Sequence, residues 1–227
     1  MLDAHYNGDI NLANYWTAGD ERIETLEPIP AGTTGETQPF QTITLRIIGF
    51  NHDKLENKIG NRSRSAVTIM TSALYKSGYM DTANNNINNA DWSKSPRRAW
   101  CNNDFFNVLP SPLSKLIKTV IKSSYFVGLS DLTTSKTITT SDKVFLLSPI
   151  EISKYAPVDY YDDSTQYTLF KDGATDIIGP NPNIWLRDSR TTSGGITQYT
   201  VSYALLGSTL TTADPNSANR IMPAFCL

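Results

Sequence analysis

The segment FQTITLRIIGF, residues 40–50, most constrains the fold, because its apolar and polar residues alternate. Ile43, Leu45 and Ile47 occupy every second position, and threonine or arginine fills the positions between them. Side chains of a β-strand point to opposite faces in turn, so a period of two predicts a strand with one buried face. We therefore expect a sheet here, with a covering layer packed on the buried face.

Three later segments are predicted to be helices. The first, residues 63–78, has apolar residues three and four apart and ends at a glycine. The second runs from about residue 97 to residue 107, after the Ser-Pro start signal of an N-cap and first helical residue. The third starts at Ser111-Pro112, and residues 113–121 give a nearly complete apolar helix face.

The other segments favour strands and loops. Glycine and proline divide residues 1–39 into loops and short strands, and LTTSKTITTSD, residues 132–142, is polar and loop-like. KVFLLS, residues 143–148, is a candidate buried strand, and short strands follow in the region 183–227. Because no flexible linker divides the chain, we expect one α+β domain over residues 1–227, on which residues 1–39 pack.

Composition restricts the partners. The chain has 227 residues, a net charge of −2 and an isoelectric point near 5.7, which does not favour binding to nucleic acid or to anionic lipid. We found no apolar run long enough for membrane insertion and no signal-peptide pattern at the start. We therefore expect a soluble chain, with release through lysis if it leaves the cell.

Candidate catalytic and metal-binding residues are few. The two histidines, His5 and His52, leave little room for a catalytic triad or a zinc site, and Asp53 beside His52 is more typical of a turn. The cluster VDYYDDS, residues 158–164, has carboxylates and tyrosines that could hold Ca²⁺ or stack on a sugar, but it lacks the spacing of an EF-hand loop. We expect no catalytic residue, metal or cofactor.

The cysteines, tryptophans and arginines favour structural roles. Cys101 and Cys226 are compatible with one disulfide, but we interpret them as buried thiols. Trp185 lies in a short apolar run that predicts a core strand, and the other tryptophans are also expected in or near the core. Two arginines before Trp100, Arg97 and Arg98, are expected to brace a loop through carbonyls or carboxylates.

Several segments, taken together, carry a family resemblance. They are INLANYWTAGD, IIGFNHD, GYMDTANNN, WSKSPRRAWCNNDFFNVLP, DKVFLLSPIEI, NIWLRDSR and RIMPAFCL. Their succession over residues 9–227 resembles an uncharacterised domain family found in tail proteins of phages of Gram-positive bacteria and in gut bacterial surface proteins. Those domains look distantly like the C-type-lectin fold, which retroelement-diversified receptor-binding proteins and formylglycine-generating enzymes share.

The resemblance implies a C-type-lectin-like α+β fold, with small twisted antiparallel sheets, two to three flanking helices and long ordered loops. The triplets with which calcium-dependent lectins bind sugars are absent, as is the close cysteine pair of formylglycine-generating enzymes. These departures speak against Ca²⁺-mediated sugar binding and against oxidase activity. The positions that the resemblance makes part of the scaffold are Trp16, Arg97, Arg98, Trp100, Phe105, Leu109 and Trp185.

In lectin-like folds of this type the C-terminal sheet and its loops present the variable face, so the resemblance implies a binding surface within residues 156–219. Tyrosine supplies flat contact area with little rotamer entropy to lose, and polar neighbours add directional hydrogen bonds to a glycan or a protein. The candidate ligand-binding residues are Tyr160, Tyr161, Asp162, Tyr167, Arg190, Gln198, Tyr199 and Asn216.

The resemblance leads to a hypothesis about function, with alternatives. We expect a binding module on a virion surface, on the tail or capsid, that recognises a host cell-surface glycan or protein. The alternative is a structural virion subunit, such as a capsid decoration, head fibre or tail connector, that contacts other virion proteins only. A glycan-acting enzyme would need paired carboxylates facing one cleft, which nothing in the spacing requires. Virion fibre proteins are commonly trimeric, which makes a homotrimer the oligomer to consider.

Overall fold

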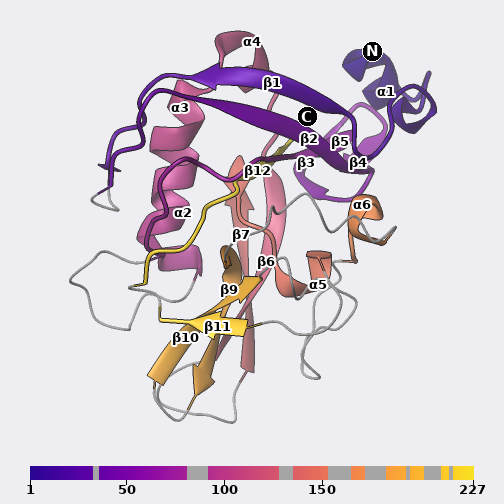
Figure 1. Ribbon diagram of the computed structural model, residues 1–227. Helices are drawn as coiled ribbons and strands as arrows, with labels where there is room; N and C mark the ends of the chain where they lie inside the picture. Colours follow the sequence, from indigo (N-terminus) through magenta and orange to yellow (C-terminus); the bar gives the residue numbers. More distant parts are fainter. Residues whose placement is uncertain are drawn as a thin grey trace.

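A computed structural model describes residues 1–32, 36–80, 92–127, 135–152, 165–171, 183–192, 195–201, 211–214 and 217–227. Over these residues the chain is a mixed α/β protein whose strands form three mostly antiparallel sheets, accompanied by short helices (Figure 1). No helix in these ranges is long and apolar enough to cross a membrane.

The largest sheet has five strands, all antiparallel to their neighbours. The predicted strand is confirmed as β2 (Gln41–Phe50), in which Ile43 and Leu45 are buried and Thr42 is exposed. The carboxyl-terminal strand lies inside the sheet, so the two ends of the sequence share one core. In order, the strands are β1 (Glu21–Leu26), β2, β5 (Val67–Thr71), β12 (Ala224–Cys226) and β8 (Val144–Phe145).

The helix predicted at residues 63–78 is wrong, because its apolar part is the strand β5. All five β5 residues are buried, between β2 on one side and β12 on the other. A strand covered on both faces has a continuous apolar sequence, and periodicity cannot separate such a run from a buried helix.

The predictions at residues 111–121 and 132–142 are also wrong. The helix there is a single turn, α4 (Ser111–Ser114), and Val120 begins β6 (Val120–Val127). The expected polar loop contains β7 (Ser135–Asp142), which pairs with β6 over eight residues. β-Branched valine, isoleucine and threonine favour a strand pair at these positions. The second sheet has the order β4 (Arg62–Arg64), β3 (Lys54–Ile59), β6 and β7.

The helix predicted after Ser95-Pro96 is confirmed. The Ser95 side chain accepts a hydrogen bond from the Arg97 amide, and Pro96 occupies the first turn. Helical structure then runs through α2 (Pro96–Trp100), a π-helical turn η4 (Cys101–Phe105) and α3 (Phe106–Val108), preceded by the 3-10 turn η3 (Trp92–Lys94).

Short helices also occur where only loops and strands were expected. The amino terminus begins with α1 (Leu2–Asn7), followed by the 3-10 turn η1 (Leu12–Asn14). Two single-turn helices, α5 (Pro149–Ile152) and α6 (Thr168–Lys171), lie near each other on the right side of the view, below the five-stranded sheet (Figure 1).

The third sheet lies at the opposite end of the molecule from β1 and β2 (Figure 1). It has the order β11 (Thr211–Ala213), β10 (Gly195–Val201) and β9 (Ile184–Thr192), in agreement with the short C-terminal strands expected from the sequence. Residues 184–189 of β9 are buried, so this strand joins the third sheet to the core.

The core contains the largest side chains. Trp92, Trp100 and Trp185 are at most 1% exposed, and Trp16 packs partly buried against the same cluster. Cys101 and Cys226 are buried free thiols, as interpreted from the sequence. The scaffold arginines also brace the fold: Arg97 donates to the Tyr79 carbonyl and to Glu36.

Gly60 lies in the turn after β3 and packs closely against the backbone of α1, and a substitution there tests this contact. Its φ is 53°, and a Cβ at this position would overlap the Tyr6 carbonyl oxygen, which also accepts the Asn61 amide at 2.9 Å. We expect Gly60→Ala to lower the free energy of unfolding by about 2–3 kcal/mol. The control is Gly8→Ala, where φ is also positive but no atom lies within 4 Å of the added Cβ. Urea unfolding of both variants measures the difference, and equal losses would contradict this packing.

Candidate functional site

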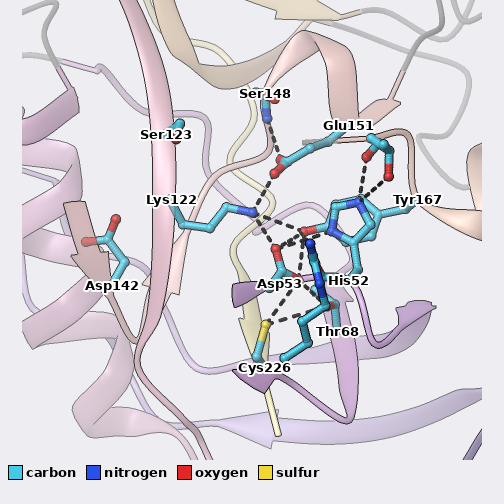
Figure 2. A network of polar contacts seen from close by, with 12 residues as sticks. His52, Asp53, Thr68, Lys122, Ser123, Asp142, Ser148, Glu151, Tyr167 and Cys226 are labelled. Atoms are coloured by element: carbon cyan, nitrogen blue, oxygen red, sulfur yellow. Dashed lines mark hydrogen bonds and ion pairs between the residues drawn. The ribbon is translucent and has the colours of Figure 1, made fainter. Parts of the chain in front are cut away.

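Asp53 is the first member of a buried polar network (Figure 2). It follows β2 and a turn at Asn51, whose φ is 51°, and its side chain is 2% exposed. Its carboxylate accepts hydrogen bonds from Lys122 Nζ at 2.6 Å and from the Tyr167 hydroxyl at 2.9 Å, and also from Thr68 Oγ1. Every carboxylate oxygen is thus paired inside the protein.

Lys122 reaches this carboxylate from the middle of β6. Its Nζ lies between Asp53 and Glu151, and it donates to a carboxylate oxygen of each (Figure 2). The ammonium also lies 4.3 Å from the centre of the Phe145 ring. A lysine that is only 2% exposed must be paired in this way, because an isolated charge at this depth would be strongly destabilising.

Glu151 and Arg187 complete the set of charges. Glu151 lies in α5, and its carboxylate accepts the Ser148 amide at 2.8 Å, as in a capping box. Arg187, from β9, donates to both oxygens of Glu151 at 2.5 and 2.9 Å. It also donates to the carbonyls of Leu146 and Ser123, so one guanidinium ties β9 to β6 and to the segment after β8.

The four charged groups sum to zero and set one another's protonation. Burial raises the pKa of Glu151, but Arg187 and Lys122 outweigh it and bring the pKa down to about 2. Burial likewise opposes ionisation of Asp53, yet Lys122 and His52 hold its pKa well below the usual value. The pKa of Lys122 is raised, because the two carboxylates overcome the effect of burial. All four side chains are therefore ionised at neutral pH.

Tyr167, His52 and Cys226 surround these charges. The Tyr167 hydroxyl donates to Asp53, and burial together with that carboxylate raises its pKa well above the ordinary value. His52 lies over the Tyr167 ring, with 3.9 Å between ring centres (Figure 2). The pKa of the Cys226 thiol is also raised well above normal, first by burial and then by Asp53.

This network is suited to holding the fold together. The lysine is charged, the carboxylates are ionised and hydrogen-bonded to it, and the phenol and thiol keep their protons, so these groups are engaged with one another. Within the described residues, no group of three or more metal-ligating side chains is arranged for a metal ion. His5 is likewise buried, and its Nδ1 accepts the Leu12 amide at 3.3 Å.

The structure places the predicted ligand-binding residues in three ways. Arg190 lies on β9, and Gln198 and Tyr199 lie on β10, where the register pairs Thr197 with Arg190 and Gln198 with Ser189. Tyr167 is not on the surface as expected, because its side chain is fully buried against Asp53. The other four predicted residues lie outside the described residues: Tyr160, Tyr161, Asp162 and Asn216.

A groove of about 560 Å³ opens at the other end of the molecule. Leu45, Ile47 and Ile69 of the five-stranded sheet line one wall, and the segment around α4 lines the other with prolines and leucines. Charged residues also contribute to the lining of the groove. They are Asp20, which precedes β1, and the charged residues of β1 itself. The hollow is therefore mainly apolar, with charged residues along one part of its lining, unlike the surface expected for a glycan.

Sequence reasoning missed Lys122, Glu151 and Arg187. Lys122 was assigned to no site, and its pairing with Asp53 spans 69 residues along the chain. The run Ser148-Pro-Ile-Glu151 has the spacing of a capping box, which is the one local signal that could have identified Glu151.

A family model described as Domain of unknown function (DUF6273) matches residues 65–227. The matched region includes Lys122, Glu151, Arg187 and Tyr167 but begins after Asp53. No curated protein and no solved structure matches the chain.

Replacing Lys122 by methionine tests whether the network stabilises the fold. Lys122→Met removes the ammonium that pairs with Asp53 and leaves Glu151 paired with Arg187 alone, so we expect the free energy of unfolding to fall by about 3–5 kcal/mol. The matched control is Lys58→Met, since Lys58 is exposed on β3. Chemical denaturation measures both, and similar stability of the two variants would show that the network contributes little.

Acid unfolding tests the ionisation of Glu151. Its pKa is about 2 in the folded protein and 4.5 ordinarily, so the folded state binds fewer protons than the unfolded state between these values. The contribution of Glu151 is therefore complete above about pH 4.5 and is lost as the pH falls toward about 2. Carbon-13 NMR titration of the Glu151 carboxyl group measures this directly. A midpoint near 4.5 in the folded protein would contradict the ion pairs described.

Proposed function

We propose that this chain, which belongs to the family described as Domain of unknown function (DUF6273), is a non-catalytic binding module of a virion surface that recognises a glycan or a protein on a host cell. The resemblance to phage tail domains supports the location and the kind of partner. The C-type-lectin-like relationship, with its variable C-terminal face, is part of the same proposal.

The observation that carries this proposal is the course of β9. Its first six residues are buried, and Arg187 within them is tied to Glu151 by two hydrogen bonds. The same strand continues to Arg190 and pairs with β10, which carries Gln198 and Tyr199. A ligand-binding sheet held in this way is positioned by the rigid core, and this preorganisation lowers the entropy cost of binding.

The neutralised network supports binding in preference to catalysis. Lys122, Asp53, Glu151 and Tyr167 bind one another and are buried, so they are not available to contact a ligand. We therefore assign the recognition surface to the C-terminal sheet. The sheet supplies tyrosine, glutamine and arginine, residue types that combine flat contact area with directional hydrogen bonds.

The groove favours a second candidate function, that of a structural virion subunit. Its mainly apolar lining, which includes the exposed Leu116, resembles a protein-docking surface more than a glycan site. In this alternative the chain contacts neighbouring virion proteins and has no host ligand.

Binding to intact cells tests the first proposal. We expect fluorescently labelled protein to bind candidate host cells saturably. Arg190→Ala and Tyr199→Ala should each weaken this binding about tenfold or more, as expected of central contacts. The matched controls, Lys58→Ala and Tyr75→Ala, remove an exposed cation and an exposed tyrosine elsewhere on the surface and should leave binding unchanged.

Periodate treatment of the cells separates the ligand classes. Loss of binding after treatment identifies a glycan, and unchanged binding identifies a protein. Absence of binding to every candidate host, or equal effects of the test and control variants, would contradict the proposed recognition surface and favour the structural alternative.

A further inference from the structure

The strand β1 forms one edge of the five-stranded sheet, and within the described residues it pairs with β2 only. Proteins usually protect such an edge with charged side chains, a proline, a bulge or a covering segment, because its free amide groups can pair with another chain. β1 carries the charged residues Glu21, Arg22 and Glu24, so whether it can pair depends on how these charges meet those of the other strand. The six residues of β1 contain no proline and pair with β2 in unbroken register. At its centre Ile23 is 70% exposed.

The backbone of Ile23 faces this open edge. Its partner in β2 is Thr44, whose amide donates to Ser72 Oγ at 3.0 Å and whose carbonyl accepts the Ser72 amide at 2.7 Å, both on the β5 side. In an antiparallel pair, two opposite residues either both direct their N–H and C=O groups toward each other or both direct them away from each other. The N–H and C=O of Ile23 therefore point outward, as do those of Glu21 and Thr25.

Arg22 and Glu24 flank Ile23, and a two-fold axis can bring each of them opposite the unlike charge of a second copy. An axis through Ile23 sets Ile23 opposite its own copy and Arg22 opposite Glu24 of the copy, twice. An axis through Arg22 would oppose two arginines, and an axis through Glu24 would oppose two glutamates. Opposite charges across a strand pair stabilise it and like charges destabilise it. Only the axis through Ile23, among these three, joins unlike charges.

Within one chain, the charged side chains of β1 already lie where a second copy could pair with them. Arg22 and Glu24 form an ion pair with each other at 2.6 Å, so both side chains lie on the same face of β1. Glu21 is neutralised by Arg46 on the neighbouring strand and would lie opposite Thr25 of the copy. The approach of a second β1 therefore brings no unpaired like charges together.

We propose that a second copy of this chain pairs antiparallel with β1 about a two-fold axis at Ile23, which joins the two five-stranded sheets into one. Such an interface is closed, so assembly through this edge stops at a dimer. A pairing of six residues is smaller than the interface of a permanent complex, so the dimer forms reversibly as the concentration rises. This inference does not depend on the proposed recognition of host cells.

Charge reversal and charge exchange test the register. By sedimentation equilibrium we expect the wild-type protein to change from monomer to dimer with concentration. Arg22→Glu and Glu24→Arg should each weaken the dimer about tenfold or more, because each places like charges opposite each other twice. The double variant restores opposite charges and should recover dimerisation to within about threefold of the wild type. Lys58→Glu, a reversal at an exposed site of another sheet, is the matched control.

Cysteine cross-linking gives an independent readout. Ile23 would lie about 5.5 Å from its copy between Cα atoms, which is within disulfide range. Both native cysteines are buried, so a thiol introduced by Ile23→Cys is the accessible one. With oxidised glutathione it should give a covalent dimer much faster than the exposed control Thr42→Cys.

Three results would overturn the proposal. They are a monomer mass for the wild type at every concentration, a trimer mass, and a double charge variant that dimerises no better than the single variants. Equal cross-linking of Ile23→Cys and Thr42→Cys would likewise exclude the two-fold axis at Ile23.

Discussion

Lys122 lies between the buried carboxylates of Asp53 and Glu151. The relative positions of the three sheets depend on the contacts among these three side chains and their neighbours. Asp53 precedes β3 of the second sheet, which also contains Lys122, whereas Glu151 lies in α5 and holds Arg187 of the third sheet through two hydrogen bonds. The carboxyl-terminal strand of the first sheet brings the Cys226 thiol to 3.3 Å from Asp53. Removing such charges from water is costly, so a network of this kind requires every partner to be present.

This constraint connects the fold to both proposals. Because Arg187 is held by the core, β9 presents the C-terminal sheet in a fixed position, as a recognition surface needs. At the opposite end, β1 is the outer strand of a sheet whose interior contains the C-terminus, and its charged side chains leave the edge complementary to itself. A two-fold pairing at β1 would leave the C-terminal sheets of both copies free, so a dimer could engage two sites on one cell and gain avidity.

Local patterns in the sequence predicted part of this structure. Alternation identified β2, and the Ser95-Pro96 signal located the main helix, because both depend on neighbouring residues. The helix expected at residues 63–78 is the strand β5, since burial on both faces removes the alternation that marks a strand. The network could not be predicted, because Lys122 pairs with groups 69 and 29 residues away. Tyr167 was assigned to the surface for its residue type, although its partner Asp53 keeps it in the core.

Native-state hydrogen exchange tests most directly whether the network unites the sheets. The Arg187 amide donates to the Leu147 carbonyl, the Tyr125 amide donates to Asp188, and the Thr71 amide in the first sheet donates to the Pro223 carbonyl. If the network ties these parts together, all three amides should exchange only by global unfolding, with the opening free energy found by denaturation. Exchange of Arg187 and Tyr125 through a smaller opening, while Thr71 stays protected, would show that the third sheet opens independently and would contradict the account.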